Sequence, residues 1–421
     1  MFKTPRGTQD ILPQDQPAWQ HIENTILTLC HRYGFERIST PVFEDTGLFT
    51  RTVGEETDIV QKEMYTFKDR GDSEITLRPE GTAPVCRAYI QHGMHNRPQP
   101  VKLYYFATIY RYERPQTGRF REHHQFGAEA IGDKDPSLDA EIIHMAWKIF
   151  NNLGLKDLTT QLNTIGCPKC RPVYLENLKD FYSSRIHEMC GDCRVRHQRN
   201  PLRLLDCKNP VCQSAADSSP RSYDYLCPEC GQHFEKLKTY LRILEIPFLL
   251  NHRLVRGLDY YTRTVFEVQP EDVGGQSTIG GGGRYDNLIG ELGGPPTPAV
   301  GFATGLERIM LNMEKQHLLP KSNGGIDIFI APLDEQAREK GIGLLNILRQ
   351  EGFSAMMAAG EKSLKAQLRQ AGAFSARYVI IIGEEEIKKN SVILKDMATG
   401  EQETIPANSL VNSISKRLKG S

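Results

Sequence analysis

The sequence predicts an α+β protein in which an antiparallel sheet, flanked by helices, is interrupted by a helical insertion and followed by a small α/β domain. Three observations lead to this prediction. Two runs rich in aromatic and β-branched residues, 102–112 and 124–131, flank a loop that contains Pro and Gly, as in a long antiparallel hairpin. The segment 167–250 differs in composition and holds eight of the ten cysteines. Beyond residue 325, short strands alternate with helices.

The part that precedes the insertion is expected to contain three helices besides the hairpin. A helix is predicted over 17–33, because apolar residues recur on one face and Gly34 ends the pattern. A short strand over 37–42 should follow and end at a proline bend. Further helices are expected over 84–91 and 138–151, on either side of the hairpin.

After the insertion the sheet is expected to resume, to a total of six or more strands. Strand character returns at Leu254 and is clearest over 260–268. Residues 280–286 are predicted to form a glycine-rich turn that enters a helix, and residues 300–308 a strand that leads into a helix. A polar, glycine-rich linker covers 321–325. The predicted domains are 1–320, interrupted by the insertion 167–250, and 325–421.

The C-terminal domain is predicted from alternating strand and helix patterns. Strands are expected at 326–330, 353–358, 378–382 and 391–395, and helices at 335–350, 363–370 and 410–418. About a hundred residues in this order are typical of a small α/β domain.

The composition is that of a globular protein with no net charge. Of the 421 residues, 39% are hydrophobic, and 52 Lys and Arg balance 52 Asp and Glu. Zero net charge argues against a nonspecific nucleic-acid coat protein, although local patches can still dock nucleic acid. The first residues show no secretion signal, and no apolar run approaches the ~18 residues that span a bilayer. We expect a cytoplasmic protein that does not bind membranes.

The eight clustered cysteines fall into four pairs that suggest structural zinc. Paired cysteines in a chain without a secretion signal more often hold a metal than form disulfides. Pro follows the first cysteine of two pairs, and these two pairs bracket the segment. The predicted sites are therefore Cys167, Cys170, Cys227 and Cys230, and separately Cys190, Cys193, Cys207 and Cys212. The alternative is a set of buried reduced cysteines, or occasional disulfides, in a small helical domain.

Several arginines at strand ends lie near carboxylates and glycines. These are Arg111, Arg119, Arg121, Arg256 and Arg308. Guanidinium groups are planar, always charged and suited to phosphate oxygens. Since the sequence has no P-loop, dinucleotide fingerprint or nucleophile elbow, these arginines favour a polyphosphate site of another kind. The alternative is that each is a surface arginine paired with a nearby glutamate.

Five blocks in a fixed order are typical of one enzyme family. They are residues 40–51, 110–121 with 125–129, 254–262, 282–286 and 301–308. The first, second and last resemble motifs 1, 2 and 3 of class II aminoacyl-tRNA synthetases. The block 254–262, which contains Arg256-Gly257-Leu258-Asp259-Tyr260-Tyr261, and the block 282–286 resemble the two histidine-specific signatures of histidyl-tRNA synthetases. The resemblance covers nearly the whole chain.

This resemblance implies ATP-dependent ligation of L-histidine to tRNA(His) through a histidyl adenylate, with release of AMP and diphosphate. The substrate carboxylate is already ionised, so attack on the α-phosphorus needs alignment and charge neutralisation rather than a general base. The family places Arg256 and Arg111 at the reacting groups. It assigns ATP binding to Arg111, Arg119, Arg121 and Arg308, with Mg²⁺ expected on the β- and γ-phosphates.

The histidine pocket is also assigned by resemblance. Its expected members are Glu80, Gly81, Thr82, Arg111, Gln125, Glu129, Arg256, Tyr260 and Tyr261. The α-ammonium needs acceptors, and the imidazole offers two nitrogens, one for Glu129 and one for Tyr261. Without the resemblance, Glu129 could be a strand-end carboxylate paired with a loop arginine. The tyrosines could be ordinary strand aromatics, and the glycines 280–283 a flexible turn instead of a close approach to the pocket.

The family further implies a homodimer shaped by motif 1 and recognition of the tRNA anticodon by the C-terminal domain. The motif 2 loop and the insertion would contact the acceptor stem. Basic residues that could serve tRNA are Arg194, Arg196, His197, Arg199, Arg203, Lys416, Arg417 and Lys419. The alternative for each cluster is a solvated helix face.

Two other functions fit the sequence less well. A catalytically silent paralogue of this fold is the regulatory subunit of ATP phosphoribosyltransferase, which usually lacks the intact block at 256–261 and the anticodon domain. Both are present here. A pure RNA-binding module would leave the arginines and the pocket residues without a purpose.

Overall fold

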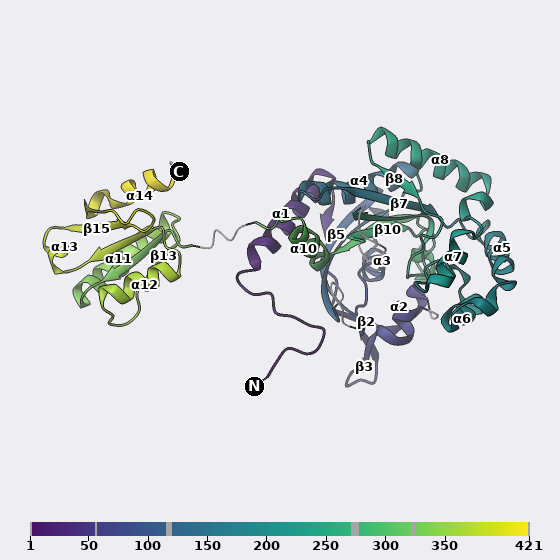
Figure 1. Ribbon diagram of the computed structural model, residues 1–421, viewed down its shortest axis with the longest axis horizontal. Helices are drawn as coiled ribbons and strands as arrows, with labels where there is room; N and C mark the ends of the chain where they lie inside the picture. The colour runs from purple at the N-terminus through teal and green to yellow at the C-terminus, as the bar shows by residue number, and fades with distance from the viewer. Residues whose placement is uncertain (1, 55–56, 115–119, 271–277, 321–324, 420–421) are drawn as a thin grey trace. The chain divides into compact units, whose positions relative to one another are not determined.

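The computed structural model describes residues 2–54, 57–114, 120–270, 278–320 and 325–419. The chain divides into two compact units, Met1–Pro320 and Lys321–Ser421, each with its own core (Figure 1). Most of the predicted linker, residues 321–324, lies outside the described residues.

An eight-stranded sheet forms the centre of the larger unit. Its strand order is β1 (Glu36–Arg37), β5 (Val101–Tyr110), β6 (Glu122–Ile131), β11 (Ala299–Gly305), β10 (Gly280–Arg284), β9 (Thr262–Pro270), β7 (Leu158–Thr164) and β8 (Phe248–Leu250). All inner pairings are antiparallel, and only the two edge strands pair in parallel with their neighbours. The predicted fold class is confirmed.

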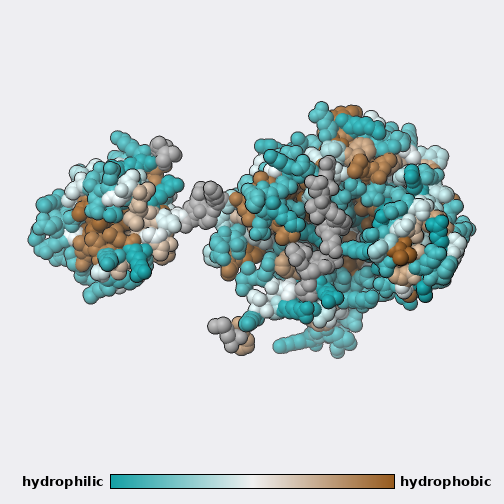
Figure 2. Space-filling model, viewed as in Figure 1, coloured by the Kyte–Doolittle hydropathy of each residue, from teal (hydrophilic) through white to brown (hydrophobic). Residues whose placement is uncertain are grey.

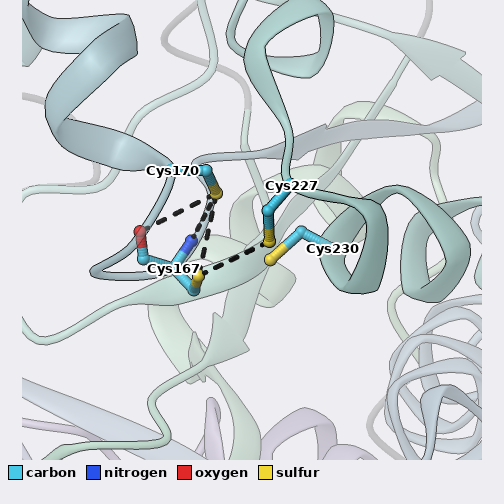
Figure 3. Close-up of side chains that lie close together, drawn as sticks. All are labelled: Cys167, Cys170, Cys227 and Cys230. Carbon is cyan, nitrogen blue, oxygen red and sulfur yellow. Dashed lines mark hydrogen bonds between the residues drawn. The ribbon is translucent and has the colours of Figure 1, made fainter.

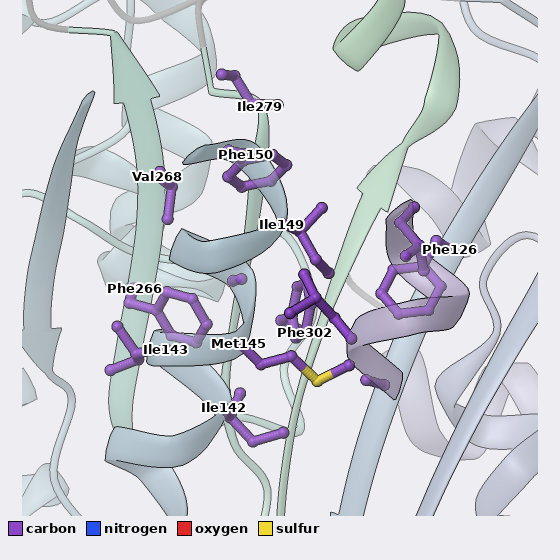
Figure 4. Packing of buried hydrophobic residues seen from close by; sticks show 14 of the residues in the cluster. Phe126, Ile142, Ile143, Met145, Ile149, Phe150, Phe266, Val268, Ile279 and Phe302 are labelled. Atoms are coloured by element: carbon purple, nitrogen blue, oxygen red, sulfur yellow. The ribbon is translucent and has the colours of Figure 1, made fainter. Parts of the chain in front are cut away.

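Helices cover both faces of this sheet because its strands alternate between two cores. Along β5, Tyr104 belongs to one core, whereas Leu103 and Tyr105 belong to the other. The first core packs against α1 (Gln16–Arg32), α4 (Pro136–Asn152), α8 (Pro228–Ile243) and α10 (Leu306–Lys315). Figure 4 shows side chains of α4 interleaved with Phe126, Phe266 and Phe302 from three strands. The second core packs against α3 (Thr82–Gln91) and α9 (Leu288–Glu291).

The hairpin and the flanking helices follow the sequence prediction closely, but three elements do not. The strand expected over 37–42 is replaced by the two-residue strand β1, which ends four residues before Pro41. Residues 254–261 form a loop, and β9 begins at Thr262. The glycine run is not a turn but the buried central strand β10. Side-chain periodicity could not reveal this strand, because four of its five residues have no side chain.

The glycines of β10 are required by close packing. A Cβ on Gly282 would lie 2.0 Å from the carbonyl oxygen of Gly301, and one on Gly283 would lie 2.3 Å from that of Thr264. No side chain fits at either distance. The glycine run therefore lets three strands approach each other beside the pocket.

The insertion is mainly helical, as predicted. Its helices are α5 (Arg171–Ser183), α6 (Gly191–Arg199), α7 (Pro210–Asp217) and α8, followed by the edge strand β8. A three-stranded sheet of β2 (Phe43–Asp45), β4 (Glu74–Leu77) and β3 (Tyr65–Lys68), with α2 (Thr46–Val53), completes the larger unit.

The C-terminal unit is a five-stranded α/β structure. Its strand order is β13 (Ala355–Met357), β12 (Ile328–Pro332), β14 (Tyr378–Ile382), β15 (Ser391–Asp396) and β16 (Gln402–Pro406). Its helices are α11 (Glu335–Gln350), α12 (Leu364–Ala373), α13 (Glu384–Lys388) and α14 (Leu410–Lys419). The sequence prediction missed β16 and α13, two short and mostly polar elements.

Hydrophilic residues predominate on the face shown in Figure 2, with apolar residues gathered in separate patches. In the described part of the chain, no helix combines the length and the apolar character needed to cross a bilayer.

The close packing of β10 gives a stability prediction. Gly282→Ala should lower the free energy of unfolding of the larger unit by about 1–3 kcal/mol or more, because backbone atoms of β11 must move away. Gly290→Ala, in α9, is the matched control: its Cβ would meet only Pro296 Cα at 4.0 Å. Urea unfolding should show a lower midpoint for the first variant alone. Equal midpoints would contradict the packing argument.

Candidate functional site

A cavity of about 1100 Å³ lies over the sheet in the larger unit, between α3, the loop 251–261 and the start of α10. Nine of the residues predicted for the histidine and ATP sites line it. They are Glu80, Thr82, Arg111, Gln125, Glu129, Arg256, Tyr260, Tyr261 and Arg308. Five separate segments of the sequence thus converge on one space.

Glu129, on β6, lies buried at one end of the cavity. Its carboxyl group accepts hydrogen bonds from Thr82 Oγ1 at 2.7 Å and from the Tyr285 hydroxyl at 2.5 Å. Burial raises the pKa of Glu129 to about 8. Its partners in the described chain are thus hydroxyl groups, not the loop arginine of the alternative interpretation. A Cβ on Gly301, opposite on β11, would lie 1.7 Å from Glu129 Oε2, so only glycine leaves room for this carboxyl group.

A second buried carboxyl group, that of Glu80, lies at the N-terminus of α3. Its two oxygens accept the backbone N–H groups of Thr82 at 2.6 Å and Ala83 at 2.8 Å. Burial raises the pKa of Glu80, and these two hydrogen bonds and Arg111 oppose that rise. Thr82 therefore joins both carboxyl groups, through its backbone to Glu80 and through its hydroxyl to Glu129.

Gly81 does not line the cavity. It instead makes room for the side chain of Tyr105 of β5. A Cβ on Gly81 would lie 2.3 Å from the Tyr105 ring, and one on Gly127 would lie 2.2 Å from it. The Tyr105 hydroxyl thereby reaches Gln125 Oε1 at 3.4 Å and Glu129 Oε1 at 3.5 Å.

Tyr260 and Tyr261 belong to the loop that precedes β9 and form an aromatic wall. Their ring centroids are 4.7 Å apart, and the Tyr260 ring lies 5.7 Å from that of Tyr285. All three rings are buried. They line a cavity rather than the face of a strand, which the alternative interpretation had supposed.

Arg256 provides a cation in the cavity wall, near Tyr261. Its Nη1 donates to Glu267 of β9, and its guanidinium carbon lies 5.9 Å from the Tyr261 ring centroid. Burial would lower the pKa of Arg256, but Glu267 raises it, so the side chain stays charged. A Cβ on Gly281 would lie 2.8 Å from Arg256 Nη1, so β10 again leaves space by lacking a side chain.

The other predicted arginines are divided between two places. Arg111 Nε donates to the carbonyl of Pro79 at 2.7 Å, and Arg308 Nη1 donates to that of Thr278 at 2.7 Å. Both line the main cavity. Arg121 instead stacks on Tyr112, 3.7 Å from the ring centroid, in a separate hollow of about 440 Å³. Arg119 lies outside the described residues.

Comparison with known proteins identifies the family. The histidyl-tRNA synthetase family matches residues 7–169 and 185–309, and an anticodon-binding domain matches residues 327–417. The chain is similar to the histidine–tRNA ligase of Dehalococcoides mccartyi, 54% identical over 99% of this chain and 100% of that protein. A crystal structure of the apo histidyl-tRNA synthetase of S. aureus has 40% identity and a TM-score of 0.83, and covers 99% of this chain and 100% of that one.

This chain belongs to the histidyl-tRNA synthetase family. The family, the fold class and the enzyme class predicted from the sequence are thereby confirmed. A histidine–tRNA ligase of Desulforamulus reducens, 49% identical over 98% of this chain and 99% of that protein, agrees.

Four further residues of this synthetase line the cavity although the sequence analysis did not select them as site residues. Tyr285 lies within the second histidine signature and could have been selected. Glu267 could have been found as a carboxylate on the strand that follows Arg256. His123 also lines the cavity. Burial, and then the charge of Arg111, lower the pKa of His123 to about 3, so its imidazole is neutral. Glu113, two residues after Arg111, also lines the cavity.

One signature residue points away from the site. Arg284 is fully buried and pairs with Asp139 of α4, which also accepts from His233 of α8 at 3.2 Å. Arg284 also donates to Asp286 at 3.1 Å. This network joins β10, α4 and the insertion, so its role is to hold the sheet together next to the cavity.

The eight paired cysteines form the two predicted groups. In each group the four sulfurs lie within 4.8 Å of one another. Figure 3 shows Cys167 and Cys170 before α5 facing Cys227 and Cys230 at the start of α8. The Sγ–Sγ distance is 3.7 Å for Cys167–Cys170, 3.9 Å for Cys167–Cys227 and 3.8 Å for Cys190–Cys207. A tetrahedral zinc ion with Zn–S bonds of about 2.3 Å separates its sulfurs by about 3.8 Å.

The raised pKa of Glu129 gives a pH prediction. The folded protein keeps this proton up to pH about 8, whereas the unfolded chain loses it near the ordinary value of 4.5. The folded state therefore binds more protons within this window, and the contribution of Glu129 to stability falls as pH rises from 4.5 to 8.

Glu129→Gln, which cannot ionise, should lose this part of the pH dependence. The difference in unfolding free energy between wild type and variant should change by several kcal/mol between pH 5 and pH 8.5, in favour of the variant at the higher pH. Urea unfolding of ligand-free protein measures it. A difference that stays constant with pH would show that Glu129 ionises normally.

Proposed function

We propose that this chain ligates L-histidine to tRNA(His) in two steps, through a histidyl adenylate, with release of AMP and diphosphate. The observation that supports this most strongly is one cavity that is lined both by buried carboxyl and hydroxyl groups and by fixed guanidinium groups. A regulatory subunit without catalysis is disfavoured, because the block at 256–261 is intact and lines this cavity.

The histidine side chain is proposed to lie against Glu129 and Tyr261. An imidazole has one nitrogen that donates and one that accepts, and a carboxyl group and a hydroxyl group can satisfy both. Glu80, Thr82 and Gln125 are proposed to accept hydrogen bonds from the α-ammonium group. A buried polar pocket of this kind rejects apolar isosteres by ~10⁴-fold, since its own polar groups would be left unpaired.

The guanidinium groups are proposed to hold ATP for attack by the histidine carboxylate. Arg111 and Arg256 would neutralise the α-phosphate and align the carboxylate, Arg308 would contact the nucleotide, and Arg121 and Arg119 would hold the outer phosphates. The β- and γ-phosphate oxygens are suited to Mg²⁺. No general base is needed, because the nucleophile is already charged.

The tRNA is proposed to bind across both units, with its anticodon on the C-terminal unit, which matches an anticodon-binding domain. Basic residues of α6, Arg194 and Arg196, are available for the acceptor stem. We also propose a homodimer, supported by the exposed apolar residues Val42 and Phe43 in the motif 1 segment. We propose that the enzyme acts in the cytoplasm, because its substrate is a tRNA.

Removal of the fixed cation tests the proposed reaction. Arg256→Ala should slow histidine-dependent exchange of pyrophosphate into ATP by ~10²–10⁴-fold, because a preorganised charge is lost from the transition state. Arg242→Ala, at an exposed position of α8 outside the cavity, is the matched control and should exchange at the wild-type rate. Wild-type exchange by the Arg256 variant would remove Arg256 from the reaction.

We further propose that each cysteine group holds one structural Zn²⁺ ion as four thiolates. The sulfur separations support this, as they fit a tetrahedral ion without rearrangement. Elemental analysis of protein purified without chelator should find about two zinc ions per chain. Only Cys30 and Cys86 should then remain outside metal coordination. Metal content near zero, with all ten thiols titrating after denaturation without chelator, would remove the zinc proposal and leave the ligase intact.

A further inference from the structure

The loop 251–261, which carries Arg256, rests on one part of the insertion. We call residues 190–217, which contain α6, α7 and all four cysteines of the second group, the second-cluster lobe (Figure 1). Arg203, Leu205 and Cys207 of this lobe line the main cavity. The lobe is therefore part of the wall of the proposed active site and not a distant appendage.

Contacts along most of the loop join it to this lobe. Val255, the neighbour of Arg256, is buried in the same apolar cluster as Cys193, Cys207 and Cys212. His252 Nε2 lies 3.1 Å from the carbonyl of Ala216, and Arg253 forms an ion pair of 2.5 Å with Asp217. Asn200 Nδ2 donates to Asp259 at 3.1 Å.

The direction of Arg256 depends on this attachment. Its Nη1 is held by Glu267, but its buried Nε has no hydrogen-bond partner among the described residues. Besides Glu267 and the nearby Tyr261, what constrains the side chain is its backbone, which Val255 joins to the lobe. The lobe itself has only a small apolar core, and domains of this size usually need a metal or disulfides to stay folded.

We propose that a metal ion in the Cys190, Cys193, Cys207 and Cys212 group positions Arg256 for adenylate formation. This inference rests on the proposed function, and it makes Val255 a positioning residue. The first group has less contact with the loop: next to Cys170, Arg171 donates a hydrogen bond to the carbonyl of Tyr261.

Two matched cysteine variants separate the groups. Cys190 and Cys227 are both partly exposed and both precede the first turn of a helix, α6 and α8. Serine is a favourable residue at that position, so each helix start is preserved. Cys190→Ser and Cys227→Ser should each lose about one zinc ion per chain.

The two variants should differ in catalysis. For Cys190→Ser we expect kcat of pyrophosphate exchange to fall by ~10–100-fold, because a misplacement of about 1 Å can cost that much, while the dissociation constant for histidine changes by less than ~3-fold. For Cys227→Ser we expect kcat within ~3-fold of wild type. Backbone hydrogen exchange over 251–261 should accelerate in the first variant only, a readout that does not depend on activity.

A second pair of variants leaves the cysteines intact. Val255→Ala removes most of the apolar contact that Val255 makes with the lobe and should lower kcat by ~10-fold with little change in the KM for histidine. Val255→Ile should restore most of the rate. Val211→Ala, at a 53% exposed position of α7, is the control and should leave kcat unchanged.

Wild-type kcat in both Cys190→Ser and Val255→Ala, with zinc lost from the former, would overturn the inference. An equal loss of kcat in both cysteine variants would also overturn it, since the second group would have no special role. Absence of histidine-dependent exchange in the wild type would instead refute the proposed function, and faster hydrogen exchange over 251–261 in Cys190→Ser would still support the positioning of the loop.

Discussion

Two carboxyl groups buried within one cavity constrain the larger unit more than any other feature. A buried carboxyl group is costly unless donors surround it, so Glu80 and Glu129 require backbone and hydroxyl donors from separate elements. Thr82, at the first turn of α3, donates hydrogen bonds to both carboxyl groups, and the Tyr285 hydroxyl donates to that of Glu129. The position of α3 on the sheet, and the approach of β10 and β11 to β6, follow from this need.

The space for ligands comes largely from side chains that are absent. Gly301 leaves room for Glu129, Gly281 for Arg256, and Gly127 for Tyr105. Two of the guanidinium groups that line the cavity are in turn held by neighbours, Arg256 by Glu267 and Arg111 by the carbonyl of Pro79. The charges are therefore in place before any substrate arrives, which is the condition under which electrostatic stabilisation accelerates a reaction.

The sequence revealed those features that leave a local pattern. The hairpin of β5 and β6, the helices α1 and α4 and both cysteine groups were predicted because periodicity or spacing encodes them. Strand β10 was missed, because glycine shows no alternation. The roles of Tyr105 and Glu267 were missed because each looks like an ordinary strand residue until the sheet brings it to the cavity. The hollow that holds Arg121 depends on the path of the N-terminal segment, which no motif describes.

The proton on Glu129 makes the proposed binding of histidine depend on pH. Free histidine carries an imidazole that titrates near pH 6.5, and the carboxyl group that would face it titrates near 8, so the order of the two ordinary acidities is reversed. In the proposed complex the imidazole and the carboxyl group titrate together, so each apparent pKa belongs to the pair and not to one group. Affinity should then be greatest between these apparent pKa values, where amino acid and enzyme together hold one proton. The pocket thus selects a protonation state as well as a shape.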